Sequence, residues 1–280
     1  MPSLKNIKGR IKSVNSTKQI TNAMNLVATA KLTKSKEAAL KTRPYFKKMQ
    51  ETIASIVNNA GNINTPLLKG NESKRKAYIV LAGDKGLAGG YNANIVKLVT
   101  SQIPDKENAE MIAVGRKAKE ILRAKGYKIS KEILGVSADP TYSVAKEIAD
   151  YVMELFLKGE VGEVYFAYTA FVSTLQQDPT LIRLLPAEVE KTETRTLLNY
   201  EPSPEVVLDY LIPKYVTDVV YGGLMESSAS EQGARMTAMD AATENAQEMI
   251  DKLSIQYNRA RQAVITQELT EIIGGAEALK

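Results

Sequence analysis

The chain has 280 residues, of which 44% are hydrophobic and 25% are charged, so its composition excludes an intrinsically disordered protein. It contains no cysteine and no histidine, which excludes disulfides, thiol nucleophiles, the usual zinc sites and histidine acid–base chemistry. No apolar run approaches the roughly 18 residues needed to cross a bilayer, and the basic first twelve residues lack the apolar segment of a signal peptide. We therefore expect a protein of the cytoplasm, or one that attaches to a membrane only through partners.

The net charge of +5 is distributed unevenly along the chain. Residues 1–50 carry twelve Lys or Arg and a single acid, Glu37, whereas residues 231–280 carry five basic and eight acidic residues. Such segments could attract each other or an acidic partner, and nucleic acid is another candidate for the basic one. A solvated basic face without a partner remains the simplest alternative.

The first of two long helices is predicted from about Ser3 to about Asn58. Some 55 residues of helix would extend roughly 80 Å, far beyond the usual globular helix. Pro44 should kink this helix without ending it, because helical residues continue on both sides. The apolar positions that indicate the helix repeat in steps of three and four: Ile7, Ile11, Val14, then Ile20, Met24 and Val27.

The second long helix is predicted from about Pro204 to about Ile273, with Gly274-Gly275 ending it. A heptad seam with one stutter runs along it, and alanines near the seam would let another helix approach closely. The seam residues are Met239, Ala242, Ala246, Ile250, Leu253, Tyr257, Ala260 and Val264.

Between the two helices, short apolar runs alternate with helical stretches. Strands are predicted at Ala77–Ala82, Ala109–Val114 and Glu163–Phe171, and helices at Ala93–Gln102, Arg116–Lys125 and Pro140–Lys158. The last helix has Asp139 as its expected N-cap and Gly159 just past its end. Alternation of this kind predicts a parallel α/β sheet, with polar connectors at Asn71–Lys76 and Thr192–Glu205.

The predicted fold class is α/β with long helices. An antiparallel coiled coil of the two terminal helices, residues 1–58 and 204–280, would accompany a central Rossmann-like α/β domain, residues 74–195. A compact domain cannot cover two helices this long, and each helix carries an apolar stripe that must be buried. We expect the helices to cover each other and the exposed remainder to lie inside a partner.

A glycine-rich segment, residues 83–90, follows a predicted strand and precedes a helix, where α/β proteins place phosphate loops. It lacks both the Walker pattern and the GxGxxG spacing. A tight strand-to-helix turn that needs glycine for its backbone is the favoured interpretation. Acidic pairs such as Glu268 and Glu271 lie on an ordinary charged helix face and do not indicate catalysis.

Three regions of the sequence, one near each end and one in the middle, carry a family resemblance. The matching segments are Ile7–Ile11, Ser13-Val14, Thr17–Thr21, Ala23-Met24 and Val27-Ala28 near the start, Asp84–Asn92 in the middle, and Ser230-Glu231, Ala234–Met236, Ala238-Met239, Asn245-Ala246, Tyr257-Asn258 and Arg261–Ile272 near the end. With these residues the chain resembles the gamma subunit of F-type ATP synthases, over nearly its whole length and in the same order.

The resemblance implies a central rotor stalk. Its coiled coil would occupy the axle hole of a hexamer of alpha and beta subunits, and its α/β domain would lie against the epsilon subunit and the c-subunit ring. Proton or sodium flow would turn the ring with the stalk, which drives the beta subunits through their conformations in sequence. ATP is then made on the beta subunits, so the resemblance implies no catalytic residue, no metal, no cofactor, no small-molecule substrate and no nucleic acid for this chain. It also implies a peripheral position on the cytoplasmic side of the cell membrane.

The resemblance also assigns contacts with the partner subunits. It implies that residues at the height of the beta-subunit levers, and others higher in the surrounding sleeve, contact the partners: Met24, Lys85, Ala88 and Arg235 at the levers, and Arg261, Gln262, Thr266 and Glu268 in the sleeve. Two other functions stay open at this point, a basic coiled coil that binds nucleic acid and an enzyme that binds a nucleotide at the glycine-rich turn. The acidic second helix counts against the first of these.

Overall fold

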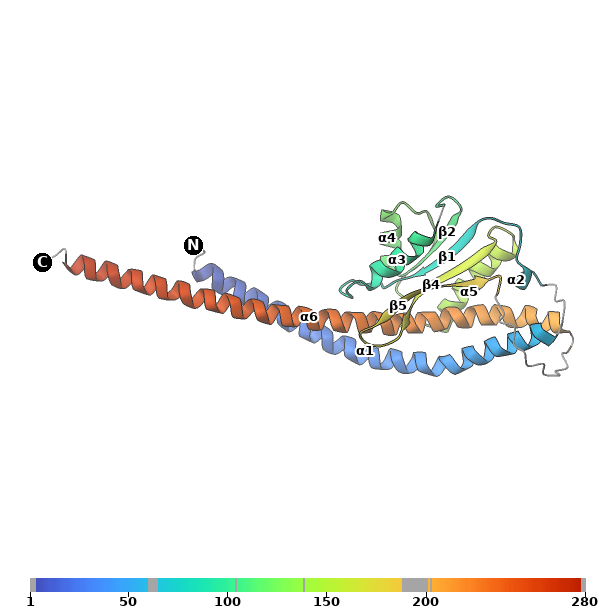
Figure 1. Ribbon diagram of the computed structural model, residues 1–280, viewed down its shortest axis with the longest axis horizontal. Coiled ribbons are helices and arrows are strands. Elements are labelled where there is room, and N and C mark those ends of the chain that lie inside the picture. The colour runs from blue at the N-terminus through green and yellow to red at the C-terminus, as the bar shows by residue number, and fades with distance from the viewer. Residues whose placement is uncertain are drawn as a thin grey trace. The chain divides into compact units, whose positions relative to one another are not determined.

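The computed structural model of the protein describes residues 4–59, 65–103, 105–137, 139–187, 201 and 203–277. Two long helices flank an α/β segment in the sequence (Figure 1). In chain order the elements are α1 (Leu4–Asn59), α2 (Pro66–Lys69), β1 (Lys76–Leu81), α3 (Tyr91–Gln102), β2 (Ala109–Val114), α4 (Arg116–Ala124), β3 (Ile129–Ile133), α5 (Tyr142–Leu157), β4 (Glu163–Phe171), β5 (Gln177–Leu185) and α6 (Pro204–Glu277). None of the described helices combines the length and the apolar character that a membrane crossing requires.

The chain divides into two compact units, and α1 and α6 contribute to both. Residues 28–235 form one unit, which we call the sheet unit. Residues 1–27 and 236–280 form the other, which we call the terminal helix pair. The division into residues 1–58, 74–195 and 204–280 that the sequence suggests stays a prediction, and part of the connector at 192–205 lies outside the described residues.

The sheet of the sheet unit has the strand order β3-β2-β1-β4-β5. β1 pairs in parallel with β2 and with β4, and β2 pairs in parallel with β3. Helices α3, α4 and α5 supply the crossovers that parallel strands require. β5 runs antiparallel to β4 at the edge, so the expectation of a purely parallel sheet is wrong for this strand.

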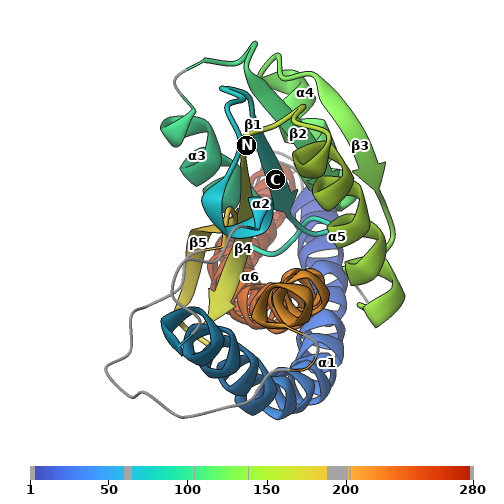
Figure 2. The ribbon, with the colours of Figure 1, turned by 90° about the vertical axis from the view of Figure 1, so that its right-hand side faces the viewer.

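Helices cover both faces of this sheet (Figure 2). An apolar core lies beneath them on each face. On one face α3 and α4 cover side chains such as Val80 and Met111. On the other face α5, α6 and the end of α1 cover side chains such as Ile79 and Ile112. Because successive strand residues point to opposite faces, each central strand contributes to both cores. The predicted fold class, long terminal helices with a Rossmann-like α/β sheet, is confirmed.

One face of α6 packs against the sheet along its first part. It is buried at every fourth residue, at Leu208, Ile212, Val216, Val220 and Leu224. Gly223 lets the helix backbone approach β4, because a Cβ atom at this position would lie 2.2 Å from the ring carbon Cε1 of Phe166. The helix is therefore seated directly on the sheet.

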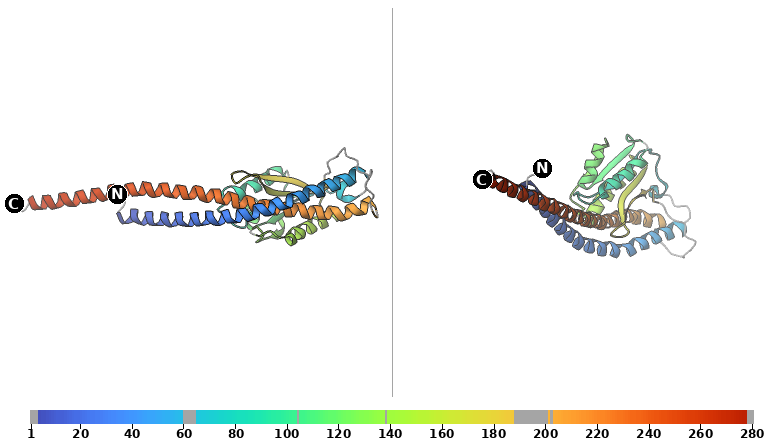
Figure 3. Two further views of the ribbon diagram at one scale, coloured as in Figure 1. Left: turned by 90° about the horizontal axis from the view of Figure 1, so that it is seen from below. Right: turned by 60° about the vertical axis from the view of Figure 1, so that its left-hand side comes forward.

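In the terminal helix pair, the start of α1 lies antiparallel to the later part of α6 (Figure 3). The side-chain amide of Asn25 donates to the carbonyl of Met236 at 3.1 Å, and the hydroxyls of Thr21 and Thr243 are 2.7 Å apart. The residue number falls on α1 as it rises on α6, so the two segments run in opposite directions. The predicted antiparallel coiled coil is confirmed here.

The seam between these helices differs in part from the prediction. On α6, Met239, Ala246 and Leu253 are buried as expected, but Val264 is 39% exposed. On α1, Ile20 and Val27 of the predicted apolar stripe are exposed, so they lie outside the seam. The heptad that begins at the first predicted apolar residues continues instead through polar ones, Lys18 and Thr21, which bond to Gln247 and Thr243 across the seam. The apolar residues of the sequence therefore indicated a face of α1 next to the one that forms the seam.

Several boundaries also differ from the sequence prediction. β3 and β5 were not predicted, because both are edge strands with mixed polar residues and no continuous apolar run. α5 begins at Tyr142 with Thr141 as its N-cap, in place of Asp139. Gly274-Gly275 does not end α6, because neither glycine adopts the left-handed backbone that stops a helix.

Candidate functional site

The glycine-rich turn, residues 83–90, follows β1 at the carboxyl edge of the parallel strands. From β1 the chain crosses to β2 on one side, while β4 pairs with β1 on the other side. The crevice at such a reversal is where open α/β sheets bind ligands. The turn therefore lies where this architecture places a ligand site.

α6 occupies this crevice and is hydrogen-bonded to both of its walls. The hydroxyl oxygen of Ser227 accepts from the backbone N–H of Thr169 on β4 at 2.9 Å, and the hydroxyl of Ser230 donates to the carbonyl of Thr169 at 3.0 Å. On the other wall, the phenol of Tyr91 donates to the carbonyl of Ser227 at 3.1 Å. These groups are buried, so a helix of the same chain fills the place that a ligand takes in related architectures.

Asp84 anchors the glycine-rich turn to the neighbouring loops. Its carboxylate accepts from the backbone N–H groups of Arg116 at 3.0 Å, Gly135 at 2.9 Å and Ser137 at 3.1 Å, and from the hydroxyl of Ser137 at 3.0 Å. Burial acts to raise the pKa of Asp84, but these hydrogen bonds outweigh it and hold the pKa below its ordinary value. Arg116 is the first residue of α4, so the protein's own carboxylate lies at a helix N-terminus that favours an anion.

Glu231 and Arg235 join α6 to the same turn. Their side chains form a buried ion pair, with Arg235 Nη2 2.6 Å from Glu231 Oε1. Arg235 Nη2 also donates to the carbonyl of Gly86 in the turn at 3.2 Å. Burial raises the pKa of Glu231, and the guanidinium of Arg235 offsets only part of that effect. Gly83 makes room for this carboxylate, because a Cβ atom there would lie 2.9 Å from Glu231 Cδ.

Leu87 is a feature of the turn that sequence reasoning missed. Its φ of 61° lies in the left-handed region, and among the described residues no other non-glycine has a positive φ. Its side chain is 64% exposed, so burial does not explain why a leucine stands there. A leucine between Gly86 and Ala88 gives no sequence signal for this backbone, which becomes visible only in the structure.

The structure places the predicted contact residues in two groups. In the sheet unit, Lys85 is exposed, whereas Ala88 is 1% exposed and Arg235 is buried with partners in its own chain. In the terminal helix pair, Met24 is half-buried beside the seam, and four residues near the end of α6 are exposed: Arg261, Gln262, Thr266 and Glu268. Lys85 and the α6 residues are therefore open to a partner, whereas Ala88 and Arg235 are not at the surface.

In the part of the chain that the structure describes, nothing covers the last part of α6. Every residue from Arg261 to Ala276 is exposed, and Figures 1 and 3 show α6 continuing past the first residues of α1. This segment carries a broad apolar stripe, with Ile265, Leu269, Ile272 and Ile273 between 47% and 68% exposed. Within the terminal helix pair it is an apolar surface without a partner in the described chain.

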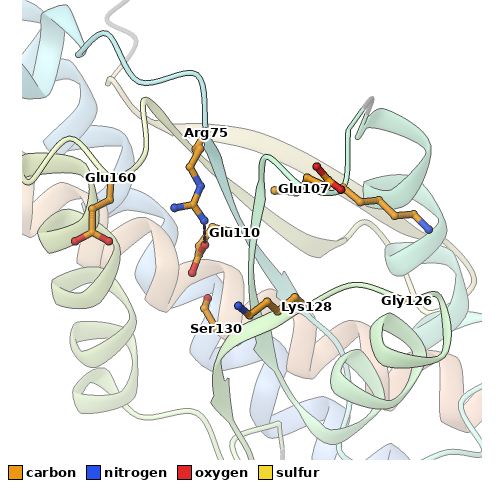
Figure 4. A pocket seen from close by; sticks show the side chains of 9 residues that line it. Arg75, Glu107, Glu110, Gly126, Lys128, Ser130 and Glu160 are labelled. Atoms are coloured by element: carbon orange, nitrogen blue, oxygen red, sulfur yellow. Dashed lines mark hydrogen bonds and ion pairs between the residues drawn. The ribbon is translucent and has the colours of Figure 1, made fainter.

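A pocket of about 570 Å³ lies at the opposite, amino edge of the parallel strands (Figure 4). Its wall is charged, and Arg75 Nη2 lies 2.6 Å from Glu110 Oε2. Lys106 donates to the carbonyl of Lys125 at 2.9 Å. None of the predicted contact residues lines this pocket. Across the described residues, no group of acidic side chains is arranged so that it could hold a metal ion.

Comparison with known proteins gives a consistent result. A family model described as ATP synthase matches residues 3–279. The chain is 51% identical, over 298 aligned residues covering 99% of each chain, to the sodium ion specific ATP synthase gamma chain of Acetobacterium woodii. It is 50% identical, over 285 aligned residues covering 99% of each chain, to the ATP synthase gamma chain of Alkaliphilus metalliredigens.

Solved structures share the fold at low sequence identity. A chain of the Euglena gracilis mitochondrial ATP synthase, in a structure of OSCP, F1 and c-ring, aligns with a TM-score of 0.73 at 19% identity, covering 99% of this chain and 94% of that one. A chain from the central stalk and c-ring of the Tetrahymena thermophila mitochondrial enzyme aligns with a TM-score of 0.61 at 23% identity, covering 80% of this chain and 99% of that one. These similarities give no support to the nucleic-acid-binding alternative.

Proposed function

Because this chain belongs to the family of ATP synthase gamma chains, we propose that it is the non-catalytic central rotor stalk of a membrane ATP synthase. In this role it turns with a ring of c subunits that is driven by ion flow. The turning stalk then pushes catalytic beta subunits through their conformations in sequence. The chain itself binds no substrate and makes no ATP.

The observation that carries the proposal is the uncovered end of α6. An apolar stripe on a helix must be covered, and from Arg261 onward the described chain offers nothing to cover it. A ring of partner subunits that surrounds the helix would cover the apolar stripe together with the other exposed faces of this segment. In the proposed assembly that ring is the hexamer of alpha and beta subunits, with Arg261, Gln262, Thr266 and Glu268 inside it.

The filled crevice supports the non-catalytic part of the proposal. An α/β enzyme needs an open crevice at the carboxyl edge of its sheet, and here Ser227, Ser230 and Glu231 of α6 stand in it. The sequence supplies neither histidine nor cysteine for acid–base or nucleophilic work. The catalysis of the complex is then left to the beta subunits.

Contacts away from the end of α6 complete the proposal. Met24 and Lys85 contact the acidic levers of the beta subunits, while Ala88 and Arg235, which are buried, support the turn from within. Exposed ion pairs contribute only about 0–1 kcal/mol each, so basic residues of α1 guide the levers without holding the rotor at one angle. The sheet unit lies against the epsilon subunit and the c ring, so the chain is peripheral to the cell membrane on its cytoplasmic side.

Rotation within the complex tests the proposal directly. Because the chain has no cysteine, a single Lys97→Cys change on α3, at an exposed position, allows a bead to be attached at one defined point. In a complex reconstituted with alpha and beta subunits, we expect the bead to turn when ATP is added. A complex that hydrolyses ATP while the bead stays still would contradict the proposed function.

A shortened chain provides the matched control. A stop after Ala260 removes the exposed segment Arg261–Ala276 and the four residues after it, so the isolated chain should melt at an unchanged temperature. The same change should weaken torque or assembly in the complex. An equally stable shortened chain that turns the bead with full torque would show that the apolar end of α6 is not the contact proposed here.

A further inference from the structure

The backbone of the glycine-rich turn is strained at one residue. Leu87 adopts a left-handed conformation, which costs an L-residue roughly 1–2 kcal/mol. Such conformations persist when the surrounding structure over-determines them. The strain at Leu87 therefore requires contacts that hold the turn, and its exposed side chain does not supply them.

Different groups hold different parts of this turn. At its start, Asn92 accepts from the N–H of Gly83 at 2.8 Å and donates to the carbonyl of Lys85 at 3.2 Å. Gly86, which directly precedes the strained residue, is held by Arg235 from α6. The guanidinium is in turn fixed by Glu231, one helical turn earlier on the same helix, in a buried ion pair.

We propose that Arg235, oriented by Glu231, is a positioning residue that clasps the carbonyl of Gly86 and thereby keeps Leu87 in its left-handed conformation. The inference rests on the proposed function, because its consequence is that the turn presents Lys85 and Leu87 to a partner in one fixed orientation relative to α6. A partner that meets a fixed turn does not have to order it on binding. Arg235 thus acts through the turn and not by touching the partner.

Spin labelling of the isolated chain measures the fixation of the turn. A nitroxide on Lys85→Cys, the single cysteine of the chain, should give an immobilised spectrum in the parent. The double change Glu231→Gln/Arg235→Met removes the clasp without leaving an unpaired buried charge, so the fold should survive. In this variant we expect the mobile component of the spectrum to increase several-fold. An unchanged spectrum would overturn the proposal.

A matched control uses an ion pair of the same helical spacing elsewhere. Glu154 and Lys158 form an exposed i,i+4 pair at the C-terminal end of α5, so Glu154→Gln/Lys158→Met removes a pair of the same spacing at the edge of the sheet opposite the turn. The label at position 85 should not respond to this change. An equal gain in mobility in the control would mean that the spectrum reports general loosening, which would also overturn the proposal.

A double-mutant cycle tests the link to Leu87 specifically. Leu87→Gly removes the backbone strain and little buried surface, and should raise the melting temperature of the parent by about 2 °C. Where the Arg235 clasp is absent, the turn is already relaxed, so the same change should give a smaller rise. Equal rises in both backgrounds would show that the clasp does not maintain the strain.

Failure of this proposal is distinguishable from failure of the proposed function. If the parent does not rotate in the reconstituted complex, the function is wrong, whatever the spin label reports. If the parent rotates and the double variant keeps an immobilised label, only the positioning role is wrong. With both correct, the double variant should pump fewer ions per ATP hydrolysed than the parent, and the Glu154→Gln/Lys158→Met control should match the parent.

Discussion

Two parts of the same helix, α6, have opposite surroundings. Between Leu208 and Leu224 a continuous face is buried against the sheet, with side chains that expose 2% of their surface or less. From Arg261 to Ala276 every residue is exposed, including large apolar ones. The backbone conformation is helical throughout, so secondary structure alone does not reveal this difference.

The two parts of α6 differ in whether their apolar side chains stabilise the chain itself or remain available to partners. The sheet-facing part of α6 is held by burial within its own unit, which is the main source of helix stability in folded proteins. The last part retains an apolar stripe without gaining any such burial from the described chain. Apolar surface kept where it contributes nothing to the stability of its own chain indicates a surface used in an assembly.

The largest expected effect comes from shortening the same residue type in the two parts. Ile212→Ala should lower the free energy of unfolding by about 2–5 kcal/mol, because it leaves a cavity in a fully buried site. Ile265→Ala, at a side chain that is 47% exposed, should change the isolated chain by no more than about 0.5 kcal/mol and reduce the yield of assembled complex. Urea denaturation of both variants provides the measurement. Similar losses in the two variants would break the distinction between the two parts of α6.

Glycine provides a second, smaller pair of substitutions with opposite signs. Gly223→Ala places a methyl group against the Phe166 ring and should destabilise the chain by about 1–3 kcal/mol. Gly274→Ala, where nothing lies within 4 Å, should stabilise the helix by about 0.4–1 kcal/mol. Thermal melting of the two variants should therefore shift in opposite directions. A loss of stability in both would show that the end of α6 is packed in solution.

The same contrast explains how far sequence reasoning reached. The two long helices and the strands β1, β2 and β4 follow from strong hydrophobic patterns, and their predicted positions agree with the structure. The α1 side of the seam was misplaced because polar Lys18 and Thr21 take seam positions, while apolar Ile20 and Val27 face outward. An apolar residue in a sequence therefore need not be buried within its own chain.

The candidate site was predictable only in outline. The glycine-rich turn was located correctly, and its interpretation as a strand-to-helix turn is confirmed. The inward position of Arg235 was not predictable, because its acceptor Gly86 is distant in sequence and a carbonyl carries no residue-type signal. The backbone of Leu87 likewise follows from tertiary contacts and not from the preference of leucine.

A smaller effect than that of Ile212→Ala is expected at Asp84 in the glycine-rich turn, which is held by hydrogen bonds in place of apolar burial. Its pKa in the folded chain lies below the ordinary value of 3.8, so its contribution to stability is complete above that pH and is lost as the pH falls through the lower folded value. Asp84→Asn keeps one acceptor oxygen and should cost about 1 kcal/mol at neutral pH. Below about pH 4 the melting temperature of the parent should fall more steeply with decreasing pH than that of Asp84→Asn. If the two melting temperatures fall in parallel below this pH, the carboxylate does not hold the turn through its charge.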